Sequence, residues 1–197
     1  IYSLLSGGSK KLTTTNKGTI NVGQIGSVGI YAKNETGTNT NSVVENKSAI
    51  NVTKAESAGI LGEKSDITNA QTTGVITLSA IKTAGIIGNK DSKVSNAGRI
   101  ETTGITPADA TEGLVGISLN ASTGTNETGG TFTLGTDFST GMYGKAASTL
   151  TNYGTITGNN KHAVGMAANA STATNETTGT ITLNGVNSTG MFGESAA

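Results

Sequence analysis

One short phrase returns along the whole chain, and it constrains the fold more than any other feature of the sequence. In each copy an apolar anchor is followed nine positions later, or sixteen in one copy, by a Gly that precedes Ile or Met. The anchors are Ile20, Ile50, Ile76, Ile100, Phe132, Ile156 and Ile181. The Gly residues are Gly29, Gly59, Gly85, Gly116, Gly141, Gly165 and Gly190. The copies begin roughly 24 to 32 residues apart, a period typical of stacked structural repeats.

Apolar and polar residues alternate with a period of two inside each copy, as they do in strands that bury one face. The anchor and its second neighbour would point inward, as Ile50 and Val52 do around Asn51. A second strand follows the Gly, with inward residues Ile30, Ile60, Ile86, Ile117, Met142, Met166 and Met191. A third strand carries Val44, Ile67, Val94 and Leu150. Strands this short are unstable alone, so equivalent strands must stack on one another.

The sequence therefore predicts an all-β fold, a right-handed parallel β-helix (solenoid) with three short strands per coil and about seven coils. We expect residues 1–197 to form a single β-helix segment. Ile1 and Tyr2 match Ile30 and Tyr31 but lack the preceding Gly. We therefore expect the chain to be a fragment of a longer repeat protein.

Recurring Asn and Gly residues predict how the coils turn. An Asn precedes each anchor, at Asn16, Asn46, Asn69, Asn96, Asn126, Asn152 and Asn175. Asn tolerates left-handed turns and can hydrogen-bond to the same residue in the next coil, so we predict a structural role for this row. A Gly two residues before most anchors predicts positive φ or a close backbone approach. These are Gly18, Gly74, Gly98, Gly130, Gly154 and Gly179, with Ser48 as the departure. At another corner, Lys33 is predicted to face Glu63.

Composition excludes several classes of partner. Thirteen basic residues balance thirteen acidic ones, so no basic surface for nucleic acid is expected. There is no Cys, which removes disulfides and thiolate metal sites. No stretch approaches the roughly 20 apolar residues of a membrane helix, so we expect no membrane insertion by this segment. We expect a monomeric rod.

Catalytic chemistry finds little support in the sequence. A β-helical polysaccharide lyase or hydrolase needs clustered carboxylates, and the best group here is Asp66 and Asp91 with Glu63 nearby. A solvated corner is the favoured interpretation of this group. Arg99 is the sole Arg and His162 the sole His, which argues against a catalytic triad or a His-rich metal site. We expect no enzyme activity, no catalytic residue, no metal and no cofactor.

One row of residues is the best candidate for ligand binding. It lies two positions after the second Gly and comprises Tyr2, Tyr31, Leu61, Ile87, Ser118, Tyr143, Ala167 and Phe192. If Ile30 and its equivalents face inward, strict alternation turns this row outward as a partly aromatic stripe. Tyr31, Tyr143 and Phe192 would then stack on sugars or dock a partner protein. The alternative is that a loop covers the row or that a bulge reverses its direction.

Two loops exceed the usual length, at Lys33 to Ser42 and at Thr102 to Glu112. The second holds Pro107, the only Pro, and Asp109. Insertions in a solenoid project from one face and often carry recognition, so Pro107 and Asp109 are further candidate ligand-binding residues. Tolerated decoration of a stalk is the alternative.

Several phrases resemble a known family. TNKGTINVGQIGSVGIYAKN (15–34), TNYGTIT (151–157) and GTITLNGVNSTGMFG (179–193) are similar to passenger-domain repeats of large type V autotransporter adhesins, especially the fusobacterial RadD-like family. The resemblance covers the whole chain. It implies a passenger secreted to the cell surface and anchored in the outer membrane of a Gram-negative bacterium in the full-length protein. It also implies attachment to a protein or glycan on host cells or other bacteria, and it carries over no binding residues.

These observations lead to one main functional hypothesis. We expect a rigid β-helical stalk within a cell-surface adhesin. A direct glycan-binding or protein-binding surface within the segment is the alternative, and a polysaccharide lyase or hydrolase is less favoured.

Overall fold

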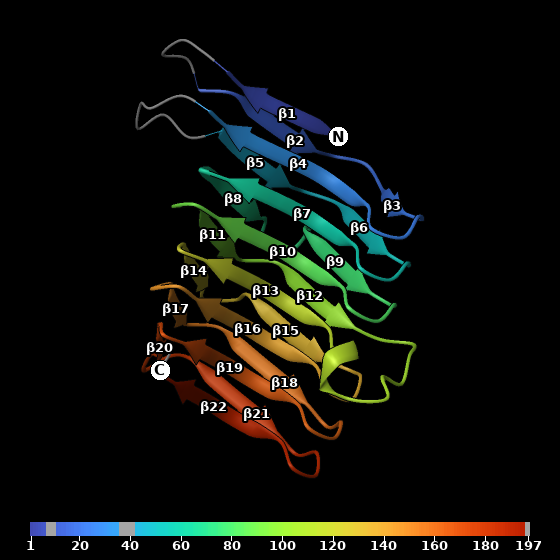
Figure 1. Cartoon of the computed structure of the whole chain (residues 1–197), viewed down its shortest axis with the longest axis vertical. Coiled ribbons are helices and arrows are strands. Elements are labelled where there is room, and N and C mark those ends of the chain that lie inside the picture. Colours follow the sequence, from blue (N-terminus) through green and yellow to red (C-terminus); the bar gives the residue numbers. More distant parts are fainter. Residues whose placement is uncertain (7–10, 36–41, 196–197) are drawn as a thin grey trace.

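A computed structural model describes residues 1–6, 11–35 and 42–195, and these residues form the predicted right-handed parallel β-helix (Figure 1). Seven coils stack on one another, each with one strand from each of three sheets. Every strand pair is parallel. Helical structure in the described residues is limited to one 3-10 turn, η1 (Ala110–Glu112). The ends of the chain lie at opposite ends of the stack.

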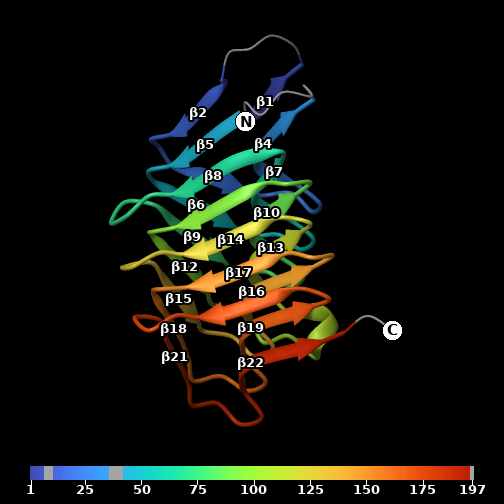
Figure 2. The same ribbon diagram turned by 90° about the vertical axis from the view of Figure 1, so that its left-hand side faces the viewer.

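The three sheets run the length of the molecule, and sheet B faces the viewer in Figure 2. Sheet A comprises β1 (Tyr2–Leu5), β4 (Val28–Asn34), β7 (Ala58–Glu63), β10 (Ala84–Asn89), β13 (Val115–Asn120), β16 (Thr140–Lys145), β19 (Val164–Asn169) and β22 (Thr189–Glu194). Sheet B comprises β2 (Thr13–Asn16), β5 (Ser42–Asn46), β8 (Ser65–Asn69), β11 (Lys93–Asn96), β14 (Thr123–Asn126), β17 (Thr149–Asn152) and β20 (Thr172–Asn175). Sheet C comprises β3 (Ile20–Val22), β6 (Ala49–Val52), β9 (Val75–Leu78), β12 (Arg99–Thr102), β15 (Thr131–Leu134), β18 (Thr155–Gly158) and β21 (Thr180–Leu183). Coil 1 is β2, β3 and β4, and the coils are numbered from there.

The core consists of the predicted inward columns. In sheet C, Ile50 pairs with Ile76, and the column continues through Ile100, Phe132 and Ile156, all essentially inaccessible to water. In sheet A the equivalent column is Ile30, Ile60, Ile86, Ile117, Met142 and Met166. Burying each such side chain contributes roughly 1.5–3 kcal/mol. The stacked apolar columns are therefore the main source of stability.

The row of Asn residues forms a continuous hydrogen-bonded ladder inside the core, as predicted. Each side-chain amide donates to the Asn oxygen of the next coil at 2.7–2.8 Å, from Asn16 through Asn46, Asn69, Asn96, Asn126 and Asn152 to Asn175. The prediction that these residues serve left-handed turns is wrong, since none of them has positive φ. They end the strands of sheet B. Positive φ falls instead on corner residues such as Glu56, Lys82 and His162.

A second buried ladder, of Ser residues, was not predicted. Each backbone N–H donates to the Ser hydroxyl of the next coil at 3.0–3.2 Å, from Ser65 through Ser92, Ser122 and Ser148 to Ser171. Most of these hydroxyls in turn donate to a carbonyl of their own corner, as Ser92 does to Asn89. The sequence carried the signal, because a Ser stands four residues before the ladder Asn in six of the seven coils.

The Gly residues that precede the anchors are required by close approach. A Cβ on Gly98 would overlap the carbonyl oxygen of Gly74, and one on Gly154 would overlap that of Gly130. Neither residue has positive φ. Of the two reasons predicted for this row, only the close approach applies.

The insertion after β12 replaces the corner that the other coils share. A cluster of buried hydroxyls lies where it leaves the coil: Thr136 Oγ1 lies 3.2 Å from Thr102 Oγ1, and Ser139 Oγ lies 3.0 Å from the same atom. Leu114 returns the chain to the core and is fully buried. Residues 36–41 of the other predicted loop lie outside the described residues.

Replacing the central ladder residue, Asn126→Ala, is expected to lower the free energy of unfolding by about 3 kcal/mol. The change leaves the Asn96 amide and the Asn152 oxygen buried without a partner. Urea unfolding measures the effect. Asn51→Ala is the matched control, because its amide bond to Asn21 is exposed and its loss should cost below about 0.5 kcal/mol. Equal losses in the two variants would contradict the structural role of the buried ladder.

Adding one methyl group at Gly154 should also destabilise the fold, by roughly 2 kcal/mol, because the Gly154→Ala side chain meets two backbone carbonyls. Gly18→Ala, at the equivalent position of coil 1, has no atom within 4 Å and should be neutral or slightly stabilising. Thermal unfolding of both variants compares them directly. A similar loss for Gly18→Ala would show that backbone conformation, and not contact, restricts these positions.

Candidate functional site

The outer face of sheet A carries the predicted apolar stripe. The pairing places Tyr2, Tyr31, Leu61, Ile87, Ser118, Tyr143, Ala167 and Phe192 in one continuous column. The column points outward, because the flanking residues of each strand are buried and its own members are not. Tyr31 and Tyr143 are half-buried, and Phe192 is 50% exposed. The strict alternation predicted for this row is confirmed.

A second column makes this face more apolar than the row alone. It lies three residues nearer the start of each strand and comprises Val28, Ala58, Ala84, Val115, Thr140, Val164 and Thr189. The outer faces of sheets B and C are polar by comparison. In coils 5 to 7 their four outward columns are all Thr: Thr123, Thr149, Thr172, Thr125, Thr151, Thr174, Thr131, Thr155, Thr180, Thr133, Thr157 and Thr182. Sheet A therefore presents the chemically distinct face of the solenoid.

The N-terminal part of the stripe is held by polar contacts. The Tyr31 ring lies 5.3 Å from the Tyr2 ring, and its hydroxyl donates to Glu63 Oε1 at 2.9 Å. Partial burial and the neighbouring Glu63 carboxylate raise the pKa of Tyr31. Lys90 Nζ donates to the other Glu63 oxygen at 2.7 Å, and this hydrogen bond lowers the pKa of the Glu63 carboxyl. One ring edge of the stripe is thus anchored by a Tyr–Glu–Lys chain.

Lys33 does not pair with Glu63 as its register suggested. The two residues are aligned across β4 and β7, but Lys33 Nζ lies 2.8 Å from Glu35 Oε1. The ammonium reaches along its own strand, while Glu63 reaches the next coil. Register fixes the backbone neighbours of a long side chain, and its rotamer then selects among several partners.

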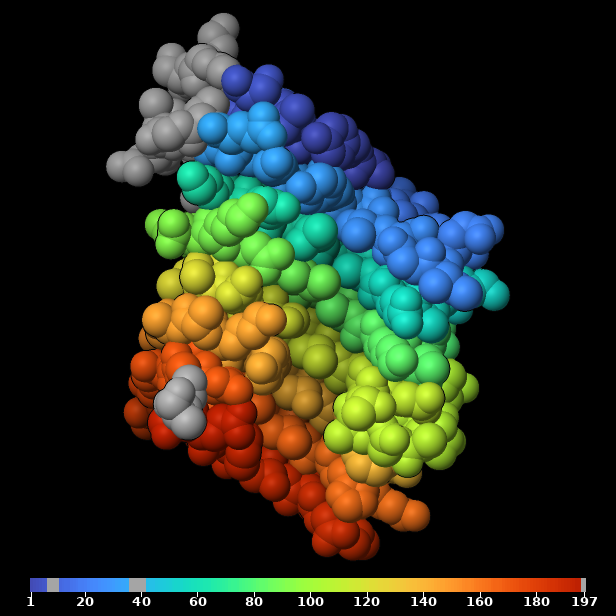
Figure 3. Space-filling view, viewed as in Figure 1, coloured from blue at the N-terminus to red at the C-terminus, as the bar shows by residue number. Residues whose placement is uncertain are grey.

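The insertion places Pro107 and Asp109 at the corner between sheets C and A, away from the stripe. Figure 3 shows its yellow-green atoms projecting from the surface. Pro107 is buried, and the exposed Asp109 caps η1. Asp109 Oδ1 accepts from the hydroxyl and the backbone N–H of Thr111 at 2.6 and 2.7 Å, and these bonds lower its pKa. In this arrangement both residues shape the insertion.

An aromatic pair that the sequence did not reveal lies at the same corner. The Phe138 and His162 rings stack in parallel with centroids 4.6 Å apart. Both residues have positive φ, at equivalent positions of successive coils. The corner strand of the insertion passes close by, since Gly113 lies against the Phe138 carbonyl. No repeated aromatic pattern marked these positions, so only the structure brings them together.

The carboxylates considered for catalysis are not gathered into one column. Asp66 is aligned with Lys93, and its Oδ2 lies 3.8 Å from Lys11 Nζ. Asp91 lies in a left-handed corner with φ of 63°. Across residues 1–6, 11–35 and 42–195, no group of three or more His, Cys, Asp or Glu side chains is placed to hold a metal ion.

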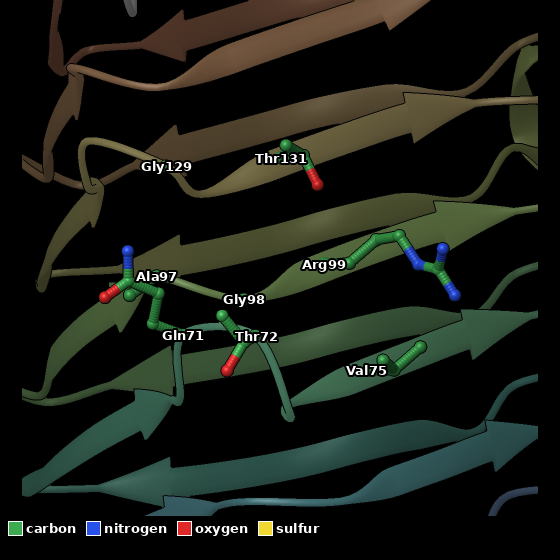
Figure 4. Close-up of a pocket in the computed structure, with 8 residues that line it drawn as sticks. All are labelled: Gln71, Thr72, Val75, Ala97, Gly98, Arg99, Gly129 and Thr131. Atoms are coloured by element: carbon green, nitrogen blue, oxygen red, sulfur yellow. The ribbon is translucent and has the colours of Figure 1, made fainter.

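A hollow of about 320 Å³ opens at the corner between sheets B and C (Figure 4). It is lined by Gln71, Thr72, Val75, Ala97, Gly98, Arg99, Gly129 and Thr131. Figure 4 shows the Gln71 side chain reaching toward Ala97, and Arg99 extending along its own strand. The hollow follows from unequal turn lengths, which the varying Asn-to-anchor distance of the sequence encodes.

Comparison with known proteins identifies the family. A family model described as the BigA third pectate lyase-like domain matches residues 37–197. Searches of curated proteins and of solved structures returned no match. The described residues contain no helix long and apolar enough to cross a bilayer. The match does not single out the RadD-like adhesins. Because it covers well over half of the sequence, the chain belongs to the family of the BigA third pectate lyase-like domain, a β-helix domain of bacterial surface proteins.

Proposed function

We propose that this chain is a rigid, non-enzymatic segment of a cell-surface adhesin, which holds binding regions of the parent protein away from the cell. The observation that carries the proposal is the continuity of the stack. The Asn ladder joins all seven coils, and the three sheets extend over the whole described length. A solenoid with such continuous contacts between neighbouring coils behaves as an extended, stiff element.

The finer assignment also remains our proposal. The parent would be an autotransporter of the RadD-like type, anchored in the outer membrane of a Gram-negative bacterium. Its partners would be proteins or glycans on host cells or on other bacteria. The family of bacterial surface β-helix domains and the Asn-anchored repeat phrases both favour this assignment.

A second candidate function is direct binding by the apolar stripe. It is favoured by the two adjacent outward columns of sheet A, which make a long flat face with Tyr31, Tyr143 and Phe192 at intervals. Aromatic side chains on such a face stack on sugars or pack against a partner protein.

Removing two whole coils tests the spacer role. Deletion of residues 127–175 joins Asn126 to Glu176, and because both original joints read Asn-Glu-Thr, the corner sequence is preserved. In cells that display the parent protein, adherence should fall while surface display persists, because the binding regions lie closer to the cell. Insertion of two coils copied from residues 47–96 should restore adherence. Failure of these substitute coils would favour recognition by the deleted residues themselves.

A lyase or hydrolase activity is expected to be absent. Incubation of the 197-residue chain with polygalacturonate and calcium should release no unsaturated or reducing products. The physical reason is that Asp66 and Asp91 each lie beside basic side chains or backbone and not beside one another. Product formation that disappears in the double variant Asp66→Asn, Asp91→Asn would overturn the non-enzymatic assignment.

A further inference from the structure

Long and short turns alternate at the corner between sheets B and C. Coils 4 and 6 turn directly after the ladder Asn, through Ala97–Gly98 and Tyr153–Gly154. Coils 3, 5 and 7 use longer turns, over residues 70–74, 127–130 and 176–179. The short turn of coil 4 is recessed between two longer ones, and this recess is the 320 Å³ hollow.

The hollow combines neutral polar groups with an apolar floor. The Gln71 amide and the Thr72 and Thr131 hydroxyls line it, and within the described residues none of these side chains makes a hydrogen bond. Val75 and Ala97 supply apolar surface beneath them. Free amide and hydroxyl groups above a small apolar floor suit a ligand that carries both hydroxyl groups and C–H faces.

The charge in the hollow is already compensated. Arg99 is its only charged lining residue, and Arg99 Nε lies 3.3 Å from Glu101 Oε2. Glu101 also accepts from the Thr77 hydroxyl at 3.0 Å. An acidic ligand would meet this carboxylate beside the guanidinium, whereas a neutral ligand loses nothing by entering. The electrostatics therefore favour a neutral partner.

The surface continues from the hollow toward an exposed aromatic ring. Gly129, with φ of +87°, forms the crest of the coil 5 turn and carries no side chain to block the way. Beyond it, Tyr153 occupies in coil 6 the position of Ala97 in coil 4 and is 38% exposed. Two coil spacings separate the positions, about 9–10 Å. That separation matches the length of a disaccharide in an extended glycan chain.

We propose that this corner binds an extended, neutral glycan chain that runs along the stack. One sugar would occupy the hollow, with hydrogen bonds to Gln71 and Thr72, and a later sugar would stack on the Tyr153 ring. The outward Thr131 and Thr155 side chains offer hydroxyls along the path. A peptide partner is less well served, because the backbone of each of these coils is already paired on both sides.

Screening of the purified 197-residue chain on an array of neutral and acidic glycans, followed by calorimetric titration with the strongest neutral oligosaccharide, tests the site. Gln71→Ala and Tyr153→Ala should each weaken binding about tenfold. Matched controls are Gln24→Ala, an exposed Gln at another corner, and Tyr143→Ala on sheet A, which should bind as the unmodified chain does. Circular dichroism verifies that all four variants fold.

Several results would overturn the site. Retention of acidic glycans alone, or of no neutral glycan, would exclude a neutral ligand. Binding that survives both corner variants but is lost in Tyr143→Ala would assign the glycan to the apolar stripe instead. The site goes beyond the stalk function, and the two fail separately, because the stalk is tested by coil deletion in cells and the site by titration of the isolated chain.

Discussion

The constraint on which the whole structure depends is that buried polar groups must find partners along the axis of the stack. Each coil brings an Asn amide and a Ser hydroxyl into an interior that excludes water, and an unpaired group there is costly. The only partner at the right distance is the same residue type one coil away. The fold therefore demands repetition of the sequence at fixed positions, while the outward positions remain free to vary.

Most of the fold followed from the sequence because this repetition is visible in it. The anchors predicted the sheet C column, and the residues after the second Gly predicted the sheet A column. Corner conformation was less predictable: positive φ falls on residues such as Phe138 and His162, which carry no turn signature. Partners of long side chains also escaped prediction, as Lys33 shows, because several carboxylates lie within reach of one ammonium group.

The candidate sites divide along the same line. The outward direction of Tyr31 and Tyr143 is a property of every repeat, so alternation predicted it. Pro107 is buried and Asp109 caps η1, which the spacing could not reveal, since an insertion has no equivalent in neighbouring coils. The hollow beside Gln71 arises from differences between repeats, and a search for what repeats overlooks it.

The orientation of the bonds between coils has a mechanical consequence. These bonds run along the stack, and the chain enters at one end and leaves at the other (Figure 1). A pulling force on the termini would therefore load the outermost coil first and peel the coils away singly. Each released coil of about 24 residues adds roughly 80 Å of slack. Under shear, a tether built this way would lengthen in steps and dissipate the load before its grip gave way.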